Sequence, residues 1–383
     1  MATDPNSWPA QVNLVPPLVH PDEIRILYLA PITPDAKITC TMSNVRLSET
    51  PEYEALSYEW GPERFKVISL NGSDIKVRQN LFDALSCLQF LDRVRALWID
   101  AICINQENIK ERNHQVSQMA SIYKQARMVV VWLGWPGNAL TDSVVTCQMA
   151  LRFLQRTLDY VGQFYDYCLV PESPYHWVND ERVKSRHIMS GLQSLSRKRY
   201  WTRLWVIQEV LLASQVQVQC GYYCISWKTL QRVCQHIQNQ AIPLQQVELR
   251  EIAESRMTTF MAGIPETATM SLSYLCWLHG EADCEKLLDK VFGLWALAPS
   301  CCQEAVPVDY SSTFDEVMQK LWDHDIAVHG MPADNAANVD EFKKGLFGNS
   351  KGSGSATVPE WLSNPEFSNH SLFTSDWTAL NPD

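Results

Sequence analysis

The residue best placed to do chemistry in this chain is Glu209, because its expected neighbours are apolar. It lies in the segment YWTRLWVIQEVLLAS, residues 200–214. If residues 201–213 form a helix, the side chains three and four positions away belong to Trp205, Val206, Leu212 and Ala213. Desolvating an unpaired carboxylate among apolar side chains is costly. Glu209 is therefore either a member of a structural ion pair, for example with Arg203, or part of a functional site.

Asp100 is the second candidate, because it directly follows the short apolar run of residues 97–99. Open α/β sheets place their ligand crevice at the carboxyl ends of parallel strands, which favours a ligand-binding role. The alternative is that Asp100 caps the following turn or orders Asn105 and Gln106 through hydrogen bonds. The sequence leaves both possibilities open.

Aromatic residues end another expected strand, in the segment YEALSYEWG at residues 53–61. Gly61 and Pro62 then turn the chain out of that strand. Tyr58 and Trp60 could stack on the ring of a ligand, although core packing is the more frequent role of Tyr and Trp. We therefore add Tyr58, Trp60 and Gly61 to the candidate site.

A strand–helix–strand unit is expected to position these side chains. Residues 97–100 and the β-branched run at 128–133 are typical of strands that are buried on both faces. Between them, apolar residues repeat at helical spacing and predict an amphipathic helix over about 109–126. This order predicts a βαβ unit with a right-handed crossover.

Further elements surround this unit. Strands are expected at 24–29 and near 37–41, and the Asn71-Gly72 pair predicts a hairpin between 67–70 and 75–77 because it tolerates positive backbone angles. Asn80 is expected to cap a helix that runs to about Arg93. The alternation in VQVQCG, residues 216–221, predicts another strand.

The pattern changes after this strand. Residues 227–298 are largely helical in pattern, and a further helix is expected at about 314–327. The Gly/Ser-rich segment at 345–361 predicts a flexible linker. We therefore expect an irregular lead-in at 1–23, an α/β domain at 24–221, a mostly helical region at 222–330, and a linker and tail at 331–383.

Composition excludes several classes of protein. The chain has 383 residues, 46% of them hydrophobic, which is enough for a substantial core. Its 32 basic and 43 acidic residues leave a formal net charge of −11, so nucleic acid and anionic membranes are not expected partners. There is neither a secretory signal nor an apolar run of membrane-spanning length, which favours a soluble, cytoplasmic protein.

The twelve cysteines do not form a metal or disulfide pattern in the sequence. There is no CxxC pair, and Cys220 and Cys224 lack partners at zinc-ligand spacing. Cys301 and Cys302 are adjacent, and we expect reduced, mostly buried thiols and no metal site. The sequence also lacks GxGxxG, GxxxxGK[ST], HExxH and GxSxG motifs, so it gives no support to phosphate-loop, zinc-protease or serine-hydrolase functions.

Three segments resemble the blocks of the fungal heterokaryon incompatibility (HET) domain. They are YEALSYEWG, the stretch from LWIDAICINQ to VVVWLG at 97–134, and YWTRLWVIQEVLLAS. DKVFGLWALAP at 289–299 and VDYSSTFDEVMQKL at 308–321 resemble segments that often follow this domain. The resemblance implies a role in the programmed cell death that follows fusion of incompatible fungal cells.

HET domains in turn resemble TIR domains, more distantly. In TIR domains that cleave NAD, the catalytic glutamate follows a tryptophan in a Trp-x-x-x-Glu arrangement, and Trp205 and Glu209 have that spacing. The resemblance implies that Glu209 is catalytic and engages the ribose of NAD, which is a substrate and not a cofactor. It also implies that Tyr58, Trp60 and Trp205 shape the nicotinamide pocket and that Asp100 orders the adjacent loop.

These observations together predict an α/β fold with a mainly parallel, flavodoxin- or TIR-like sheet flanked by helices, and a mostly helical C-terminal region. The expected function is that of a HET-family cell-death effector that hydrolyses NAD at the nicotinamide–ribose bond, active as a homo-oligomer. The alternative is a non-enzymatic signalling or scaffold module that triggers death through protein partners of the incompatibility system, with Glu209 in a structural role. Fold resemblance alone does not choose between them.

Overall fold

The computed structural model describes residues 17–34, 37–135, 190–241, 247–262, 270–330 and 339–347. The chain divides into two compact units, one ending at Gly263 and one beginning at Ile264, and each is described by itself. This division falls later than the domain boundary at residue 221 expected from the sequence. The physical reason is that helix α9 (Trp227–Ala241) packs on the strands at one edge of the sheet. Most of the expected lead-in at 1–23 lies outside the described residues.

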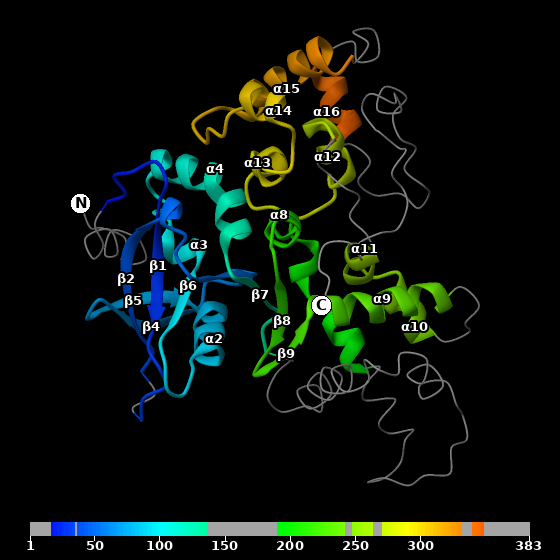
Figure 1. Ribbon diagram of the computed structural model, residues 1–383. Coiled ribbons are helices and arrows are strands. Elements are labelled where there is room, and N and C mark those ends of the chain that lie inside the picture. The colour runs from blue at the N-terminus through cyan, green and yellow to red at the C-terminus, as the bar shows by residue number, and fades with distance from the viewer. Residues whose placement is uncertain are drawn as a thin grey trace, which may run out of the picture. The chain divides into compact units, whose positions relative to one another are not determined.

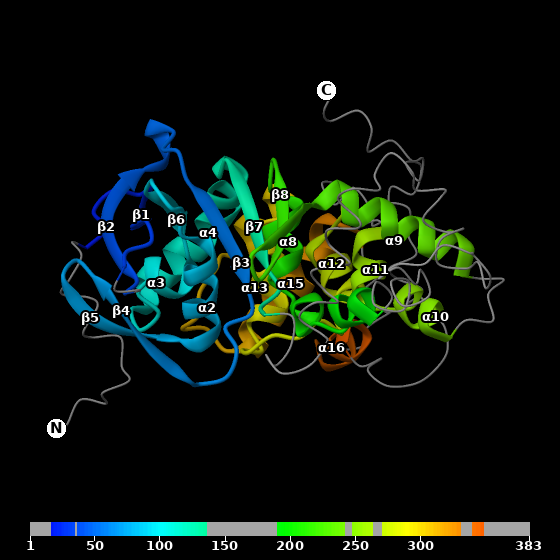
Figure 2. The ribbon, with the colours of Figure 1, turned by 90° about the horizontal axis from the view of Figure 1, so that it is seen from below.

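The first unit is built on one nine-stranded sheet, counted over the described residues, with the order β5-β4-β2-β1-β6-β3-β7-β8-β9 (Figure 1). The β4–β5 hairpin lies at the opposite end of the sheet from β8 and β9 (Figure 2). The strands are β1 (Glu23–Leu29), β2 (Thr39–Arg46), β3 (Glu54–Tyr58), β4 (Phe65–Leu70), β5 (Ser73–Arg78), β6 (Arg95–Trp98), β7 (Met128–Trp132), β8 (Val216–Cys220) and β9 (Tyr223–Ser226).

The sheet is mixed, so the prediction of a mainly parallel sheet is wrong for the sheet as a whole. It holds for the centre, where β6, β3, β7 and β8 are neighbours and run parallel. Antiparallel pairing joins β1 to both β2 and β6, and it also forms the β4–β5 and β8–β9 hairpins. The chain passes directly from β1 to β2, from β4 to β5 and from β8 to β9, and such short connections join antiparallel neighbours, whereas a parallel pair needs a longer crossover.

The expected strand–helix–strand unit is present at the centre of the sheet. Helix α4 (Ile109–Gln125) connects β6 to β7, and both strands pair in parallel with β3, which lies between them. The Asn108 side chain caps α4 by accepting hydrogen bonds from the backbone N–H groups of Lys110 and Glu111. All five residues of β3 are buried, as are four of the five in β7, and this burial explains the continuous apolar sequence of β7.

Two local predictions near the N-terminus have different outcomes. The hairpin is confirmed, with Asn71 and Gly72 at φ values of 49° and 82° in its turn. Helix α2 (Gln79–Leu88) begins one residue before Asn80 and ends well before Arg93, so the predicted cap is wrong. The Asn80 side chain instead donates to the Glu59 carbonyl and accepts a 2.9 Å hydrogen bond from Trp132 Nε1.

Beyond the β9 edge, the first unit is completed by α9, α10 (Val247–Ala253) and α11 (Arg256–Ala262), which lie together (Figure 1). Their apolar side chains share a core cluster with β7, β8 and the segment around Trp201. This burial fixes the helices to the sheet and accounts for the length of the first unit.

The second unit is helical over its described residues. Its helices are α12 (Leu272–Leu278), α13 (Asp289–Trp295), α14 (Ser300–Ala305), α15 (Phe314–Val328) and α16 (Val339–Phe347). The predicted helix at 314–327 is confirmed, and Thr313 and Glu316 form a reciprocal capping box at its start. Helix α16 lies inside the segment expected to be linker and tail, where it buries Phe342 and Leu346. The rest of the expected linker lies outside the described residues.

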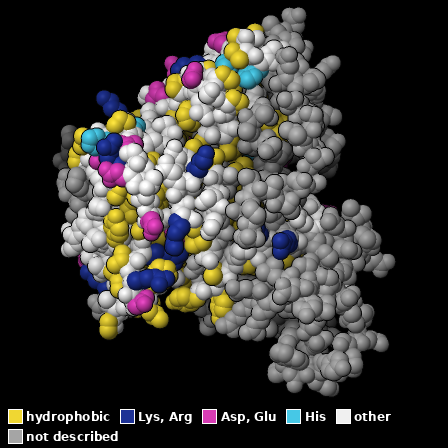
Figure 3. All heavy atoms as spheres, viewed as in Figure 1, with side chains coloured by type: hydrophobic (Ala, Val, Ile, Leu, Met, Phe, Trp, Pro, Cys, Tyr) yellow, Lys and Arg dark blue, Asp and Glu magenta, His cyan; other side chains and the backbone are white. Residues whose placement is uncertain are grey.

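The described residues carry charged side chains of both signs on the surface and cysteines with free thiols. Basic and acidic side chains lie close to one another on the face that Figure 3 shows. The ten cysteines within the described ranges are all free thiols, and seven of them are buried. Across the same ranges, none of the helices combines the length and the apolar character that a membrane span requires.

Candidate functional site

Glu209 lies on α8 (Val206–Leu211) and is only 2% exposed to solvent. The helix is shorter than the expected span of 201–213, because residues Arg199–Thr202 form a separate 3-10 turn. Arg203 follows this turn with extended backbone angles, φ −74° and ψ 136°, which interrupt any continuous helix. The Arg203 side chain reaches back to β3 and donates a hydrogen bond to the Tyr58 carbonyl.

The direct partner of Glu209 is a serine of the central strand. The Ser57 hydroxyl donates a short hydrogen bond to Glu209 Oε2. The Ser57 oxygen also lies 2.6 Å from the Tyr200 hydroxyl, so the three side chains form a buried chain of hydrogen bonds. Sequence reasoning missed Ser57, although a hydroxyl inside the buried strand EALSY was a usable signal.

Electrostatic interactions extend this cluster beyond its hydrogen bonds. Burial raises the pKa of Glu209 to about 7, against the opposing effects of Arg203 and Ser57. Burial also raises the pKa of Asp100, again opposed by the guanidinium of Arg203. Burial works to lower the pKa of Arg203, but the nearby Glu209 and Asp100 outweigh it and the net shift is upward. One cation, the guanidinium of Arg203, therefore interacts electrostatically with both carboxylates.

Asp100 begins a short helix, α3 (Asp100–Cys103), two residues after the last residue of β6. Its carboxylate accepts hydrogen bonds from Trp60 Nε1 at 2.9 Å and from the Ala101 N–H at 2.7 Å. Gln106 Nε2 donates at 3.0 Å to the backbone carbonyl of Asp100 and not to its side chain. Asp100 therefore holds Trp60 and its own turn, and the ordering of Gln106 depends on the main chain.

The loop that follows β3 is fixed around Gly61. Gly61 has a φ of +72°, and a Cβ placed there would lie 3.3 Å from the Cβ of Asn80. Arg78 donates a 2.8 Å hydrogen bond to the Gly61 carbonyl, and its guanidinium lies over the Trp60 ring at 5.5 Å from the centroid. The positive φ therefore favours glycine at this position, and any larger side chain would also crowd Asn80.

The structure brings most of the predicted site residues together. Tyr58 ends β3 beside Trp132 of β7, and burial raises its pKa well above the ordinary value, with a further effect from Asp100. Trp205 is tied to Glu209 by a backbone hydrogen bond of 3.3 Å from the Glu209 N–H to the Trp205 carbonyl. The cluster thus lies where the central parallel strands reach their carboxyl ends, the usual position of a ligand site in α/β sheets.

A cavity of about 400 Å³ lies elsewhere in the same unit, at the amino ends of β3 and β6. It includes Glu54, whose carboxylate pairs with Arg95 at 2.6 Å and also with Arg127. Glu54 and Arg95 are the first residues of β3 and β6. Tyr58 is the last residue of β3, and Asp100 lies just beyond the last residue of β6. The cavity is therefore separate from the Glu209 cluster.

The fold and the cluster define an α/β domain with a buried group of acidic and phenolic side chains around one arginine. Residues 53–209 match the model of the family described as heterokaryon incompatibility protein (HET). The matched span runs from the residue before β3 to Glu209 and so contains the whole cluster. This part of the chain matches a HET domain, as its sequence blocks predicted.

Comparison with curated proteins gives a relative with the same designation. Heterokaryon incompatibility protein 6, OR allele, of Neurospora crassa is 31% identical to this chain over 255 residues. The match covers 57% of this chain and 35% of the relative, so the matched part spans about a third of the relative's length. No solved structure matches the chain.

Proposed function

We propose that this chain is an effector of fungal heterokaryon incompatibility that kills cells by hydrolysing NAD at the nicotinamide–ribose bond. The HET domain and the relative of that name support the biological role. The proposal includes a TIR-like relationship, in which the parallel strands β6, β3 and β7 correspond to the central strands of a TIR sheet. Glu209 is then the residue that engages the ribose.

The observation that carries the enzymatic proposal is the charge imbalance of the buried cluster. Glu209 and Asp100 share the single guanidinium of Arg203, and the pKa of both carboxyl groups is raised. The cluster therefore lacks one positive charge when both carboxylates are ionised. The nicotinamide ring of oxidised NAD is cationic, so it would supply that charge on binding.

The chemistry requires little more than this cluster. Cleavage breaks the bond between the ribose C1′ and the ring nitrogen, and the bonding electron pair leaves with nicotinamide as a neutral base. An ionised Glu209 beside the ribose would stabilise the oxocarbenium-like transition state. Water then adds its oxygen to C1′ and releases a proton, so the products are ADP-ribose, nicotinamide and H⁺. Tyr58, Trp60 and Trp205 would contact the nicotinamide, and Asp100 would hold Trp60.

The buried position of Glu209 also bears on how the activity is controlled. At 2% exposure, the carboxylate does not meet solvent in this conformation. Substrate access therefore requires movement of the side chains that cover it. Self-association that stabilises an opened form would couple activity to protein concentration by mass action. We propose a homo-oligomer as the active species on this ground.

The test is incubation of the purified, concentrated protein with NAD, measuring nicotinamide release over a range of protein concentrations. The Glu209→Gln variant keeps the side-chain volume and removes the charge, and it should release no nicotinamide. The control is Glu251→Gln, a half-exposed carboxylate paired with Arg197, which should keep full activity. Equal release by wild type and Glu209→Gln would remove Glu209 from the mechanism.

One observation favours the non-enzymatic alternative. Glu209 is enclosed and hydrogen-bonded to Ser57, an arrangement that also suits a purely structural role joining α8 to β3. In that case a folded Glu209→Gln protein would trigger cell death as well as wild type does, and neither would release nicotinamide. Measuring death and NAD consumption in the same cells separates the two functions.

A further inference from the structure

A second cluster of reactive side chains lies in the helical unit. Cys301 and Cys302 are adjacent on α14, His324 lies on α15, and His329 directly follows the end of α15. This group was not apparent from the sequence, because the two cysteines are adjacent and the Cys and His pairs lie more than twenty residues apart. Packing of α14 against α15 brings them together.

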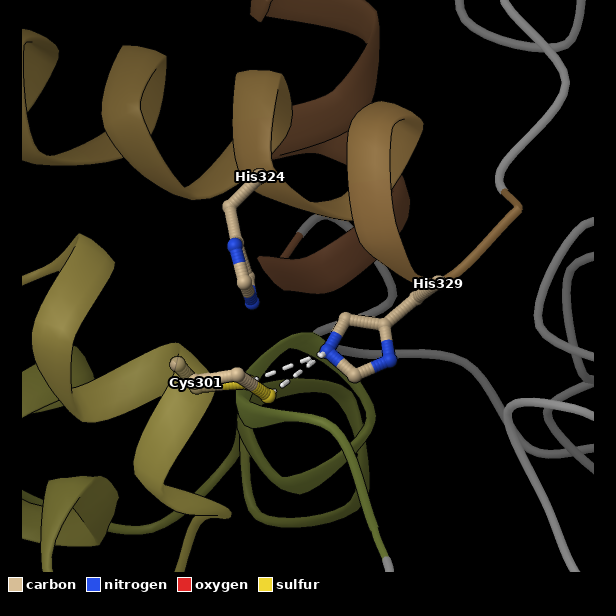
Figure 4. A group of neighbouring side chains, drawn as sticks. Cys301, His324 and His329 are labelled. Carbon is tan, nitrogen blue, oxygen red and sulfur yellow. Dashed lines mark hydrogen bonds between the residues drawn. The ribbon is translucent and has the colours of Figure 1, made fainter.

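The four side chains converge on one point. Figure 4 shows the ring of His324 directed toward Cys301, and a ring nitrogen of His329 directed toward the sulfur. His329 Nε2 lies 3.2 Å from Cys302 Sγ and 3.8 Å from Cys301 Sγ. One ligand atom from each of the four residues lies within 4.8 Å of the other three.

These distances are close to those of a tetrahedral zinc site. Zn–S bonds of about 2.3 Å and Zn–N bonds of about 2.0 Å place neighbouring ligand atoms roughly 3.3–3.8 Å apart. The two measured sulfur–nitrogen distances, 3.2 and 3.8 Å, already bracket this range. The widest separation of 4.8 Å would have to shorten by about 1 Å, a shift within the reach of side-chain rotation.

His324 provides an independent observation. Its residue is 9% exposed, and its Nε2 atom is buried without a hydrogen-bond partner in the structure. Buried polar atoms are nearly always satisfied, so an unpartnered imidazole nitrogen facing two thiols requires an explanation. A bound cation would provide the missing partner.

We propose that Cys301, Cys302, His324 and His329 bind a structural Zn²⁺ ion that joins α14 to the end of α15. Two sulfur and two imidazole nitrogen ligands in tetrahedral arrangement are the donor set that zinc prefers. The two thiols would each release a proton on binding, so the two thiolates balance the charge of the ion.

A hydrogen bond between thiol and imidazole is the simpler account of these contacts. It explains the 3.2 Å approach of Cys302 to His329. It leaves His324 Nε2 without a partner and gives Cys301 no reason to lie beside the same nitrogen. The metal site accounts for all four positions at once.

The test is elemental analysis of the full chain, purified without a polyhistidine tag and without chelators. We expect about one zinc per chain, as structural zinc sites bind tightly enough to survive purification. After removal of zinc, titration with Co²⁺ should give the sulfur-to-cobalt charge-transfer absorption of a thiolate-bound tetrahedral ion. Chelation should also lower the melting temperature of the protein.

The variants Cys301→Ser and His329→Gln alter the two more accessible ligands, so they are the least disruptive to folding. Each should weaken metal binding at least about 100-fold, the upper end of what loss of a second-shell partner causes. Cys284→Ser and His20→Ala are the matched controls outside the cluster, and both should retain zinc. Circular dichroism checks that each variant is folded.

Two outcomes would overturn the proposal. One is wild-type protein without zinc that shows no cobalt–sulfur absorption on titration. The other is zinc that persists undiminished in folded Cys301→Ser and His329→Gln proteins. Iron or copper in place of zinc would likewise reject the assignment of the ion.

Discussion

The Ser57 hydroxyl on β3 donates a hydrogen bond to the carboxylate of Glu209 on α8, across 152 residues of chain. This bond joins the central strand of the sheet to the helix that carries the proposed catalytic group. Because Ser57 also contacts the Tyr200 hydroxyl, one serine positions two titratable side chains at once. The properties of Glu209 should therefore respond to changes at Ser57 as well as to pH.

Nicotinamide release should increase with pH through neutrality. The reactive form of Glu209 is the ionised one, and its pKa is raised to about 7, mainly by burial. Protonation below that value removes the charge, so kcat/KM should rise about tenfold between pH 6 and pH 8. The measurement is initial rates at low NAD concentration across this range, with stability checked at each pH. A flat profile would show that Glu209 does not titrate in the free enzyme.

Replacement of Ser57 by alanine should shift this pH profile upward. Burial raises the pKa of Glu209, and the hydrogen bond from Ser57 lowers it. Loss of that hydrogen bond should therefore raise the pKa of Glu209 further. The variant also leaves buried oxygen atoms of Glu209 and Tyr200 without their partner, which should destabilise the fold by about 1–3 kcal/mol. Ser86→Ala, whose hydroxyl bonds a helix carbonyl, is the control and should shift neither property. An unmoved profile would contradict the role given to Ser57.

The stability of Glu209→Gln relative to wild type should increase with pH. The folded pKa of about 7 lies above the ordinary value of 4.5, so the folded protein binds the Glu209 proton more tightly than the unfolded chain does. This contribution to stability is complete below pH 4.5 and is lost as pH rises through 7. The glutamine variant has no such loss. Thermal melting at pH 5.5 and pH 8 measures the difference, with Glu251→Gln at a half-exposed carboxylate as the control.

Replacement of Asp100 by alanine should release Trp60 more than it disorders the loop at Gln106. The Asp100 carboxylate accepts the hydrogen bond from Trp60 Nε1, whereas Gln106 bonds the main-chain carbonyl. Nicotinamide release should fall while the segment through Gln106 remains ordered. Hydrogen exchange of residues 101–106 and tryptophan fluorescence report on the two effects separately. Rapid exchange throughout the segment would show that the Asp100 side chain orders the loop after all.

Local sequence patterns determined most elements of the α/β unit. The apolar runs predicted β6 and β7, because strands buried on both faces carry mostly apolar side chains. Helical spacing predicted α4 within one residue, and Asn71-Gly72 predicted a hairpin, since few residue pairs adopt positive backbone angles easily. The sequence also singled out Glu209 and Asp100, because a carboxylate next to an apolar segment is conspicuous without any structure.

Tertiary structure decided which residues meet. Strand direction depends on pairing between distant segments, and for this reason the antiparallel position of β1 between β2 and β6 was not predictable from either strand alone. The partnership of Ser57 with Glu209 and the convergence of Cys301 and Cys302 on His329 have the same origin. Contacts of this kind arise from the packing of whole elements, and residue spacing along the chain carries no record of them.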